Sequence, residues 1–277
     1  MIHVSMERPL IFTSTEEVMN QKERRQFLLR SLLNEQPETC TWRIPQSESD
    51  QKRLLRGLMN VRPAQACDPE FLRVQDAYLQ EAIAEKGITD CKSLAPLQPG
   101  LYLWQGDITT LKCDAIVNAA NSGMTGCYAP NHGCIDNAIH TFAGVQLRLL
   151  CAEIMRKQAS PEPTGQAKIT PAFNLPCRYI LHTVGPIVDN HPTARDCAQL
   201  ESCYRTCLTL AAANHLQSVA FCCISTGEFR FPNEHAAEIA IQTAKAFLNQ
   251  KTSVKQVIFN VFKDLDKEIY THLLHAN

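Results

Sequence analysis

From residue 101 onward, short apolar runs alternate with amphipathic segments, and this alternation constrains the fold more than any other feature of the sequence. Runs of strand length occupy residues 101–105, 114–120, 179–184, 219–225 and 256–262, with a weaker one at 168–172. Helix-like periodicity extends over residues 136–158, 197–215, 234–250 and 265–275. Strands that alternate with helices predict an α/β protein with a mainly parallel sheet that is covered on both faces.

The first ninety residues show a different sequence pattern, because their apolar residues recur only at helical spacing. The pattern predicts helices over residues 15–34, 49–61 and 70–86, the last one closed by Gly87. Residues 92–100 carry two prolines and a glycine, which is typical of a junction. We therefore expect a helical N-terminal extension at 1–92 and an α/β domain at 93–277. Three short helices bury too little apolar surface to be secure alone, so the extension should dock on the domain.

The stretch NAANSGMTGCYAPNHGCIDNAIH (residues 118–140) joins one of these strands to the next helix. A loop at this place offers free backbone N–H groups and the positive end of a helix dipole, which suit an anion such as a pyrophosphate. The loop also contains Cys127, His132 and Cys134 in the pattern C-x4-H-x-C. This spacing is compact enough for three soft ligands to meet at one tetrahedral ion. The spacing alone leaves open a second interpretation, in which these are ordinary loop residues of a cysteine-rich chain.

Charge and composition narrow the class of protein. The 277 residues include 27 basic and 28 acidic ones, a net charge of −1, so no overall field favours nucleic acid or an anionic membrane. The first residues lack a basic start followed by an apolar run, and no window approaches the roughly 18 apolar residues of a membrane span. The 13 cysteines are scattered and odd in number, which favours reduced thiols. We expect a soluble, cytoplasmic, monomeric protein without nucleic-acid or membrane partners.

Five blocks of sequence occur in the order found in macrodomains, the α/β/α modules that bind ADP-ribose. They are QGDIT (105–109), DAIVNAANS (114–122), CIDNAIHTFAG (134–144), GQAKITPAFNLPCRYILHTVGP (165–186) and AFCCISTGEFRFP (220–232). The resemblance covers residues 99–277 and implies a macrodomain α/β/α sandwich with a mixed, mainly parallel central sheet.

One departure from the common macrodomain pattern bears on metal binding. Macrodomains of the common hydrolase type carry a short run of glycines between the asparagine of NAAN and the aspartate of the next helix. Here the interval from Asn121 to Asp136 is longer and contains the C-x4-H-x-C. In this respect the chain resembles the zinc-dependent branch of the macrodomains, whose members also carry a helical N-terminal extension. The resemblance implies that Cys127, His132 and Cys134 bind zinc as a cofactor.

The resemblance also implies an ADP-ribose site. Asp107 would accept a hydrogen bond from the adenine amino group, with the backbone of Ile108 alongside. The diphosphate would lie between the amides of Ile135, Asp136 and Asn137, at the start of the helix after the loop, and a second loop with Ser225, Thr226, Gly227 and Glu228. Cys134 is a further residue of the implied ADP-ribose site. Phe229 would pack on the distal ribose, and the side chain of Glu228 is expected in solvent. Asn260 and Phe262 border the adenine or belong to the core, and His140, His182 and His215 are expected to be structural.

Asn121 and Asp136 resemble the pair that holds the distal ribose and are the catalytic candidates. An amide can bridge two hydroxyls, and a carboxylate can accept a proton from a hydroxyl or water. Asp136 has the alternative role of a helix N-terminal carboxylate that favours the dipole. The implied activity is that of a glycosidase which reverses ADP-ribosylation, removing mono-ADP-ribose from protein side chains. A lipoyl-carrier protein is one partner that the resemblance implies.

Two other functions fit the same residues. One is a non-catalytic ADP-ribose reader in which zinc only stiffens the loop, and the other is an O-acetyl-ADP-ribose deacetylase. The presence of both Asn121 and Asp136 favours an enzyme. Whether zinc activates water or anchors the ribose is left open by the sequence.

Overall fold

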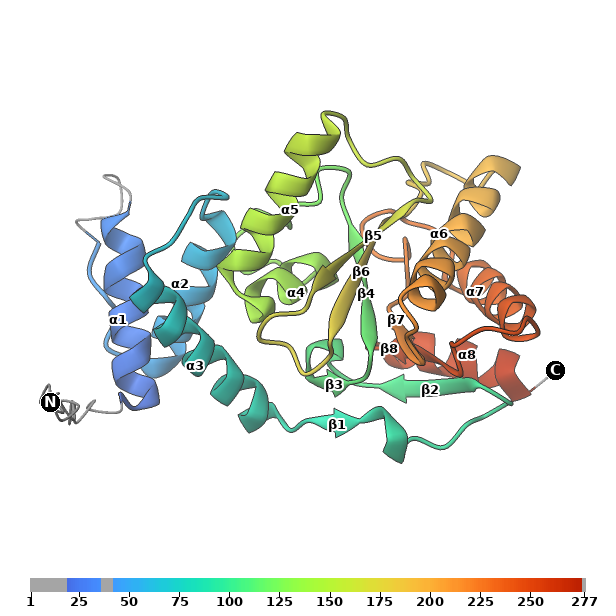
Figure 1. Cartoon of the computed structure of the whole chain (residues 1–277), viewed down its shortest axis with the longest axis horizontal. Helices are drawn as coiled ribbons and strands as arrows, with labels where there is room; N and C mark the ends of the chain where they lie inside the picture. The colour runs from blue at the N-terminus through green and yellow to red at the C-terminus, as the bar shows by residue number, and fades with distance from the viewer. Residues whose placement is uncertain (1–18, 36–41, 276–277) are drawn as a thin grey trace, which may run out of the picture.

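The structure is a computed structural model that describes residues 19–35 and 42–275. A helical part at the N-terminal side lies beside an α/β part (Figure 1). The helical part consists of α1 (Gln21–Asn34), α2 (Glu48–Val61) and α3 (Pro69–Lys86). The helices that follow are α4 (Ile135–Ala143), α5 (Val145–Gln158), α6 (Ala194–Ala213), α7 (Asn233–Leu248) and α8 (Asp264–His275).

The central sheet has six strands. They are β2 (Leu101–Gln105), β4 (Ala115–Ala120), β5 (Ala167–Pro171), β6 (Tyr179–Val184), β7 (Ser218–Phe221) and β8 (Gln256–Val261). Their order is β2-β8-β7-β4-β6-β5, and all neighbours are parallel except β5 and β6. Helices α4 and α5 lie on one side of the sheet, and α6 and α7 lie on the other (Figure 1). The expectation of a macrodomain-like sandwich with a mixed, mainly parallel sheet is confirmed.

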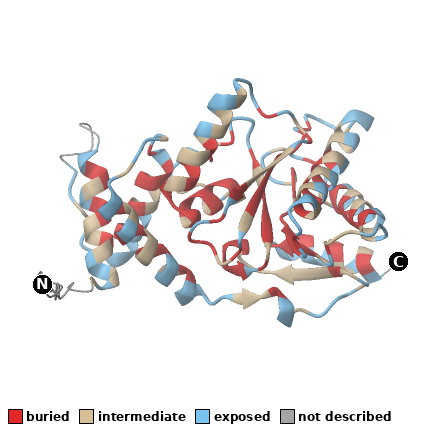
Figure 2. Cartoon of the chain, viewed as in Figure 1, coloured by how far each residue is buried: buried red, intermediate tan, exposed pale blue. Residues whose placement is uncertain are grey.

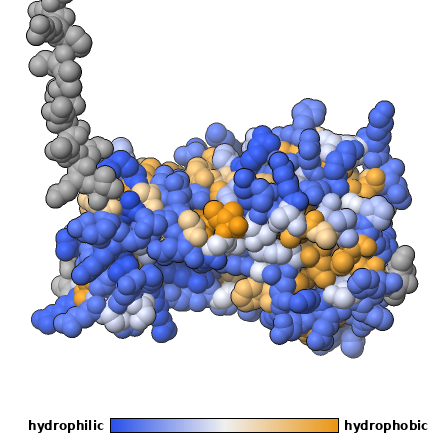
Figure 3. Space-filling model, turned by 90° about the horizontal axis from the view of Figure 1, so that it is seen from below, coloured by the Kyte–Doolittle hydropathy of each residue, from blue (hydrophilic) through white to orange (hydrophobic). Residues whose placement is uncertain are grey.

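The core follows the apolar runs that the sequence predicts as strands. Ile116, Val117, Ile180, Val219 and Ile258 are fully buried, because a parallel sheet is covered on both faces. Figure 2 shows the buried residues concentrated in the sheet and on the inward sides of its helices. The face seen in Figure 3 is mainly hydrophilic, with separate hydrophobic patches. Within residues 19–35 and 42–275, none of the helices has the length and hydropathy of a membrane span.

Two expected elements differ from the structure. The helix expected over residues 136–158 is divided at Gly144 into α4 and α5. Gly144 has φ +99°, and a Cβ there would lie 2.7 Å from Gln75 Nε2, so the chain turns where α4 meets α3. The strand expected over residues 219–225 ends at Phe221, and Ser225 adopts φ 65° in the loop that follows. Apolar content extends into that loop because Ile224 is buried under it.

The extension has a small apolar core of its own. Leu28, Leu29, Leu55, Phe71 and others from α1–α3 form a cluster that includes Val145 of α5. Helix α1 begins at Gln21 with a capping box between Asn20 and Glu23, and the part of the expected helix before residue 19 lies outside the described residues. A chain segment with β1 (Thr89–Asp90) and the 3-10 helix η1 (Cys91–Ser93) leads from α3 to the sheet, and β1 pairs with β3 (Leu111–Lys112). Near residue 92 the chain therefore passes from helices to the sheet.

Candidate functional site

The proposed site residues lie in loops at one edge of the sheet. Asp107 follows β2, residues 121–134 follow β4 and residues 225–231 follow β7. Because these strands are parallel, their carboxyl ends point to the same edge. We call residues 121–134 the cysteine loop and residues 225–231 the second loop. The short 3-10 helix η2 (Ile108–Thr110) begins immediately after Asp107.

Asp136 lies at the centre of a buried polar cluster. It is in the first turn of α4 and is 5% exposed. Asn118 Nδ2 donates to its Oδ1 at 2.8 Å, and Asn121 Nδ2 donates to its Oδ2 at 3.3 Å. Burial raises the pKa of Asp136 to about 6, although the two amides and Arg148 act in the opposite direction. A carboxylate with a pKa raised in this way is a better proton acceptor than an exposed one.

Asn121 connects this cluster to the cysteine loop. Its Nδ2 also donates to the carbonyl of Gly126 at 3.0 Å, and its Oδ1 accepts from the N–H groups of Gly123 and Met124. The amide therefore holds the first turn of the loop. Asn121 itself is exposed, so it is the outer member of the pair and Asp136 is the inner one.

Two buried histidines lie behind Asp136. His182 Nδ1 is 3.2 Å from Asn118 Nδ2, and His182 Nε2 is 2.9 Å from Thr170 Oγ1. Burial lowers the pKa of His182 to about 3, and burial with neighbouring His182 and Arg148 lowers that of His140 well below its ordinary value. Both are neutral parts of the core at physiological pH, as expected for structural histidines. His215 is exposed at the end of α6.

The cysteine loop brings the three predicted metal ligands together. One ligand atom each from Cys127, His132 and Cys134 lies within 4.8 Å of the others, and Cys127 Sγ is 3.6 Å from His132 Nδ1. Burial raises the pKa of the Cys134 thiol, and neighbouring Cys127 adds to the rise because two thiolates repel each other. Two thiolates and an imidazole are the donors that zinc prefers, so this donor set fits the ion. All three residues are only half-buried, which leaves the group accessible.

The start of α4 offers fewer amides for a diphosphate than the sequence implies. The N–H of Asn137 donates to Cys134 Sγ at 3.4 Å. Its side chain is also engaged, because Nδ2 donates to the carbonyl of Ala129 and Oδ1 accepts from Arg56. Ile135 and Asp136 are the first two residues of α4, and their amides have no helical partner. These two amides are the N–H groups at the start of α4 that could bind an anion.

The second loop faces the cysteine loop. A Cβ at Gly227 would meet no atom within 4 Å, so the space over this residue is open to a ligand. Ser225 carries the strained backbone, and its buried Oγ has no hydrogen-bond partner. Glu228 is mostly in solvent, as expected, but its Oε1 lies 3.4 Å from His132 Nε2. Phe229 is half-buried, and its carbonyl accepts from Val188 N–H.

At the end of the site where the adenine is expected, the carboxylate of Asp107 already accepts hydrogen bonds from other residues of the chain. Its Oδ1 accepts from Thr109, and its Oδ2 accepts from Lys86 Nζ of α3 at 2.8 Å. Burial acts to raise the pKa of Asp107, but these donors outweigh it and hold the pKa below its ordinary value. Asn260 belongs to the core, since it is 5% exposed and donates to the backbone at Gly106, whereas Phe262 is 76% exposed. Of this pair, Phe262 alone is available to a ligand.

Several residues of the site are absent from the sequence-based prediction. Asn118 orients Asp136, Lys86 pairs with Asp107, and Arg56 contacts the cysteine loop. Asn118 had one detectable signal, an amide inside an otherwise apolar strand. No signal in the sequence indicated Lys86 or Arg56, because both are distant in sequence from the residues they contact.

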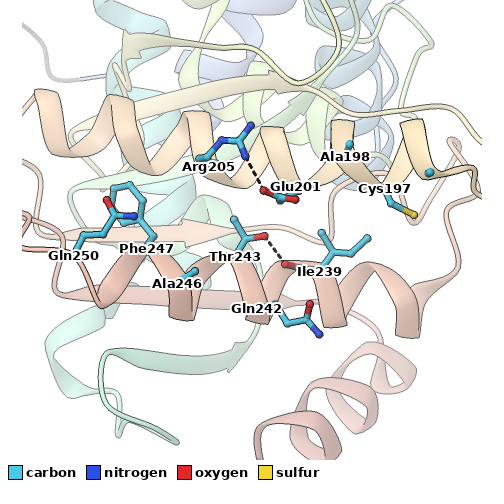
Figure 4. Close-up of a pocket in the computed structure, with 11 residues that line it drawn as sticks. Cys197, Ala198, Glu201, Arg205, Ile239, Gln242, Thr243, Ala246, Phe247 and Gln250 are labelled. Carbon is cyan, nitrogen blue, oxygen red and sulfur yellow. Dashed lines mark hydrogen bonds and ion pairs between the residues drawn. The ribbon is translucent and has the colours of Figure 1, made fainter.

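A cavity of about 550 Å³ lies elsewhere, between α6 and α7 (Figure 4). Glu201 and Arg205 on its wall form an ion pair within α6, and Thr243 donates to the carbonyl of Ile239 within α7. These polar groups are satisfied by their own helices. The cavity is not part of the proposed site.

Comparison with known proteins gives one consistent family. The Macro domain family matches residues 117–240. A protein-ADP-ribose hydrolase of Treponema medium is 58% identical over 260 residues, which cover 92% of this chain and 100% of that protein. A protein-ADP-ribose hydrolase of Staphylococcus aureus (strain MSSA476) is 48% identical over 257 residues, which cover 92% of this chain and 96% of its own. Matches of this length necessarily include most of the helical extension.

Solved structures of macrodomains indicate the same family. The Trypanosoma brucei macrodomain in complex with ADP-ribose has a TM-score of 0.62 at 27% identity and covers 83% of this chain and 97% of its own. A mutant macrodomain of Oceanobacillus iheyensis with ADP-ribose has a TM-score of 0.60 at 36% identity and covers 66% of this chain and 96% of its own. The chain therefore belongs to the macrodomain family and, within it, to the protein-ADP-ribose hydrolases.

Proposed function

We propose that this hydrolase removes mono-ADP-ribose from modified protein side chains and that a zinc ion held by Cys127, His132 and Cys134 takes part. The observation that carries the proposal is the position of Asp136. Its buried carboxylate is oriented by two amides, and the cysteine loop that begins at Asn121 reaches the start of the same helix. A non-catalytic ADP-ribose-binding protein would need the open loops but would not need a buried carboxylate that can accept a proton.

Each group has a defined task in this proposal. The diphosphate binds between the first amides of α4 and the open backbone at Gly227, which places the distal ribose between the two loops. Asn121 binds a ribose hydroxyl from the outer side. Asp136 accepts a proton from a hydroxyl or water at its Oδ2, the oxygen that faces Asn121.

A zinc ion held by Cys127, His132 and Cys134 would supply positive charge able to polarise an oxygen ligand. The two cysteines and His132 are three protein ligands, the number found in zinc sites that keep a position open. The partner is a mono-ADP-ribosylated protein, for which a lipoyl-carrier protein is one candidate.

The test is to incubate the purified chain with proteins that carry ADP-ribose on aspartate or glutamate, on serine and on arginine. We expect release of free ADP-ribose from at least one of these linkages. Asp136→Asn should lower turnover by about 100-fold or more, since it removes the proton acceptor but keeps the shape. Calorimetry should show that this variant still binds ADP-ribose.

Other outcomes identify the alternatives. Binding without hydrolysis of any linkage would make the chain a reader. Hydrolysis of O-acetyl-ADP-ribose alone would make it a deacetylase. Full hydrolysis by protein shown to be zinc-free by elemental analysis would contradict the role of the metal.

A further inference from the structure

We infer that helix α2 of the N-terminal extension is a positioning element for the cysteine loop, acting mainly through Arg56. The inference rests on the proposed function, because it concerns the same metal ligands. In this role the extension is a part of the site and not only an appendage docked on the domain.

Arg56 contacts the cysteine loop and the helix that follows it at the same time. Its Nη2 donates to the backbone carbonyl of His132 at 3.0 Å. Its Nε and Nη2 donate to Asn137 Oδ1 at 3.2 and 2.8 Å. Asn137 Nδ2 in turn donates to the carbonyls of Cys127 and Ala129, and the backbone N–H of Asn137 donates to Cys134 Sγ. One guanidinium is thus linked to the backbone or side chain of every predicted metal ligand.

The next turn of α2 holds the middle of the loop. Asn60 is 1% exposed, and its Oδ1 accepts from the N–H of Asn131 at 2.9 Å while its Nδ2 donates to Thr141 of α4. A Cβ at Gly57 would lie 3.1 Å from Asn131 Nδ2 and 3.8 Å from Pro130. Glycine at this position lets the loop lie directly against the helix.

A third contact fixes the end of α2 relative to the loop. Arg148 of α5 donates to the carbonyls of Asn60 and Arg62, each at 2.6 Å, and its guanidinium lies 4.2 Å from the centre of the Tyr128 ring. Tyr128 follows the first metal ligand directly. The same arginine therefore ties the carboxyl end of α2 to the start of the ligand motif.

The loop needs such support because its own backbone supplies little. Within residues 121–134 the backbone pairs are Met124 N–H with the carbonyl of Asn121 and His132 N–H with that of Ala129. A metal site requires its ligands to be held within about half an ångström, and packing of neighbouring elements supplies this. Residues that orient the ligands of a metal typically change its affinity by 10–100-fold when replaced.

The experiment uses Co²⁺ as a probe in the full-length chain, because tetrahedral cobalt–thiolate sites absorb visible light with an intensity that depends on geometry. Arg56→Met keeps the aliphatic stem and removes the guanidinium. We expect a weakened or shifted cobalt spectrum and at least tenfold faster loss of Zn²⁺ to a coloured chelator. Arg53→Met is the matched control: it removes an exposed arginine from the same helix and should leave both readouts unchanged.

A second readout does not need metal. Hydrogen exchange of the peptide covering residues 127–137 in metal-free protein should be faster in Arg56→Met than in Arg53→Met. If the wild type binds neither Co²⁺ nor Zn²⁺, the zinc proposal fails, and this exchange difference still decides the role of α2. Equal exchange, or identical cobalt spectra in the two variants, would overturn the inference.

Gly57→Ala separates positioning from stability. Alanine favours the helix, so the melting temperature should stay level or rise. The added methyl group forces Asn131 to move by a few tenths of an ångström, so the cobalt spectrum should still change. If Arg56→Met melts far below the wild type, its spectrum reports lost stability and Gly57→Ala becomes the deciding variant. A cobalt spectrum of Gly57→Ala equal to that of the wild type would then overturn the inference.

Discussion

At the scale of single residues, the proposed site depends on amides that orient a buried carboxylate. Asn118 is fully buried in β4, and its only described donor group serves both Asp136 and His182. Replacing it with alanine leaves Asp136 with the longer contact to Asn121 as its remaining amide bond. Asn118→Ala should therefore lower kcat by about 10- to 150-fold, as expected for the loss of one hydrogen bond to a charged group, about 1.5–3 kcal/mol. Affinity for ADP-ribose should change little.

Steady-state kinetics and calorimetry check this prediction. Thr170→Val is the control, since Thr170 contacts the far nitrogen of His182 and not Asp136. A wild-type kcat in Asn118→Ala would show that the orientation of Asp136 does not limit turnover.

The buried histidines predict a loss of stability in acid. The pKa of His182 is about 3 in the folded chain and about 6.5 when unfolded, so between these values the unfolded chain binds more protons. The free energy of unfolding therefore falls as the pH drops below about 6.5. At pH 5.5 the loss from one such histidine is on the order of 1 kcal/mol.

Chemical denaturation at pH 7.5 and 5.5 measures this loss. His182→Asn keeps an acceptor for Asn118 but cannot be protonated, so its stability should depend less on pH. His215→Asn, an exposed position, should behave like the wild type. An unchanged pH dependence in His182→Asn would show that His182 is not the group involved.

At the scale of elements, Gly144 determines that α4 and α5 are separate helices. Its φ of +99° is unfavourable for other residues, and a Cβ would lie 2.5 Å from Gln146 Oε1 and 2.7 Å from Gln75 Nε2. Gly144→Ala should lower the free energy of unfolding by about 2 kcal/mol or more, from backbone strain together with steric conflict. Denaturant titration is the measurement.

Gly87 is a suitable comparison for Gly144. It also has positive φ, +88°, but a Cβ there would meet nothing within 4 Å. Gly87→Ala should show the backbone cost alone, on the order of 1–3 kcal/mol for its φ of 88° and ψ of 123°, and should cost less than Gly144→Ala. Equal losses in the two variants would mean that the contacts around Gly144 adjust without cost.

At the scale of the whole molecule, the extension and the macrodomain meet at an interface that contains both apolar and polar contacts. Removing residues 1–92 would expose Val145 and Phe142 and leave Asp107 without Lys86. We expect the fragment 93–277 to melt well below the full chain and to lose zinc more readily, because it lacks Arg56 and Asn60. Melting curves and metal analysis of both proteins test this.

The fragment distinguishes two roles of the extension. A fragment that binds ADP-ribose normally but loses metal would support the role of α2 at the cysteine loop. Stability and zinc content equal to those of the full chain would show that residues 1–92 contribute nothing to the fold or the site.

The sequence by itself determined the class of fold and the place of the proposed site. Short apolar runs mark strands that a parallel sheet buries on both faces, so the strands around Val117, Ile180 and Ile258 lie where they were predicted. The motifs located Asp107, the cysteine loop and the second loop, because parallel strands bring such loops to one edge. The spacing of Cys127, His132 and Cys134 allowed their ligand atoms to converge, and the structure brings these atoms within 4.8 Å of one another.

Only the tertiary structure decided which partners these residues have. The contacts of Arg56 with His132 and of Lys86 with Asp107 join residues more than twenty positions apart, and no local pattern encodes such pairs. The break at Gly144 was hidden because both halves of residues 136–158 have helical periodicity, and only the packing of Gln75 against the glycine requires the turn. Periodicity records which faces are buried, whereas the geometry of a site depends on which distant side chains meet there.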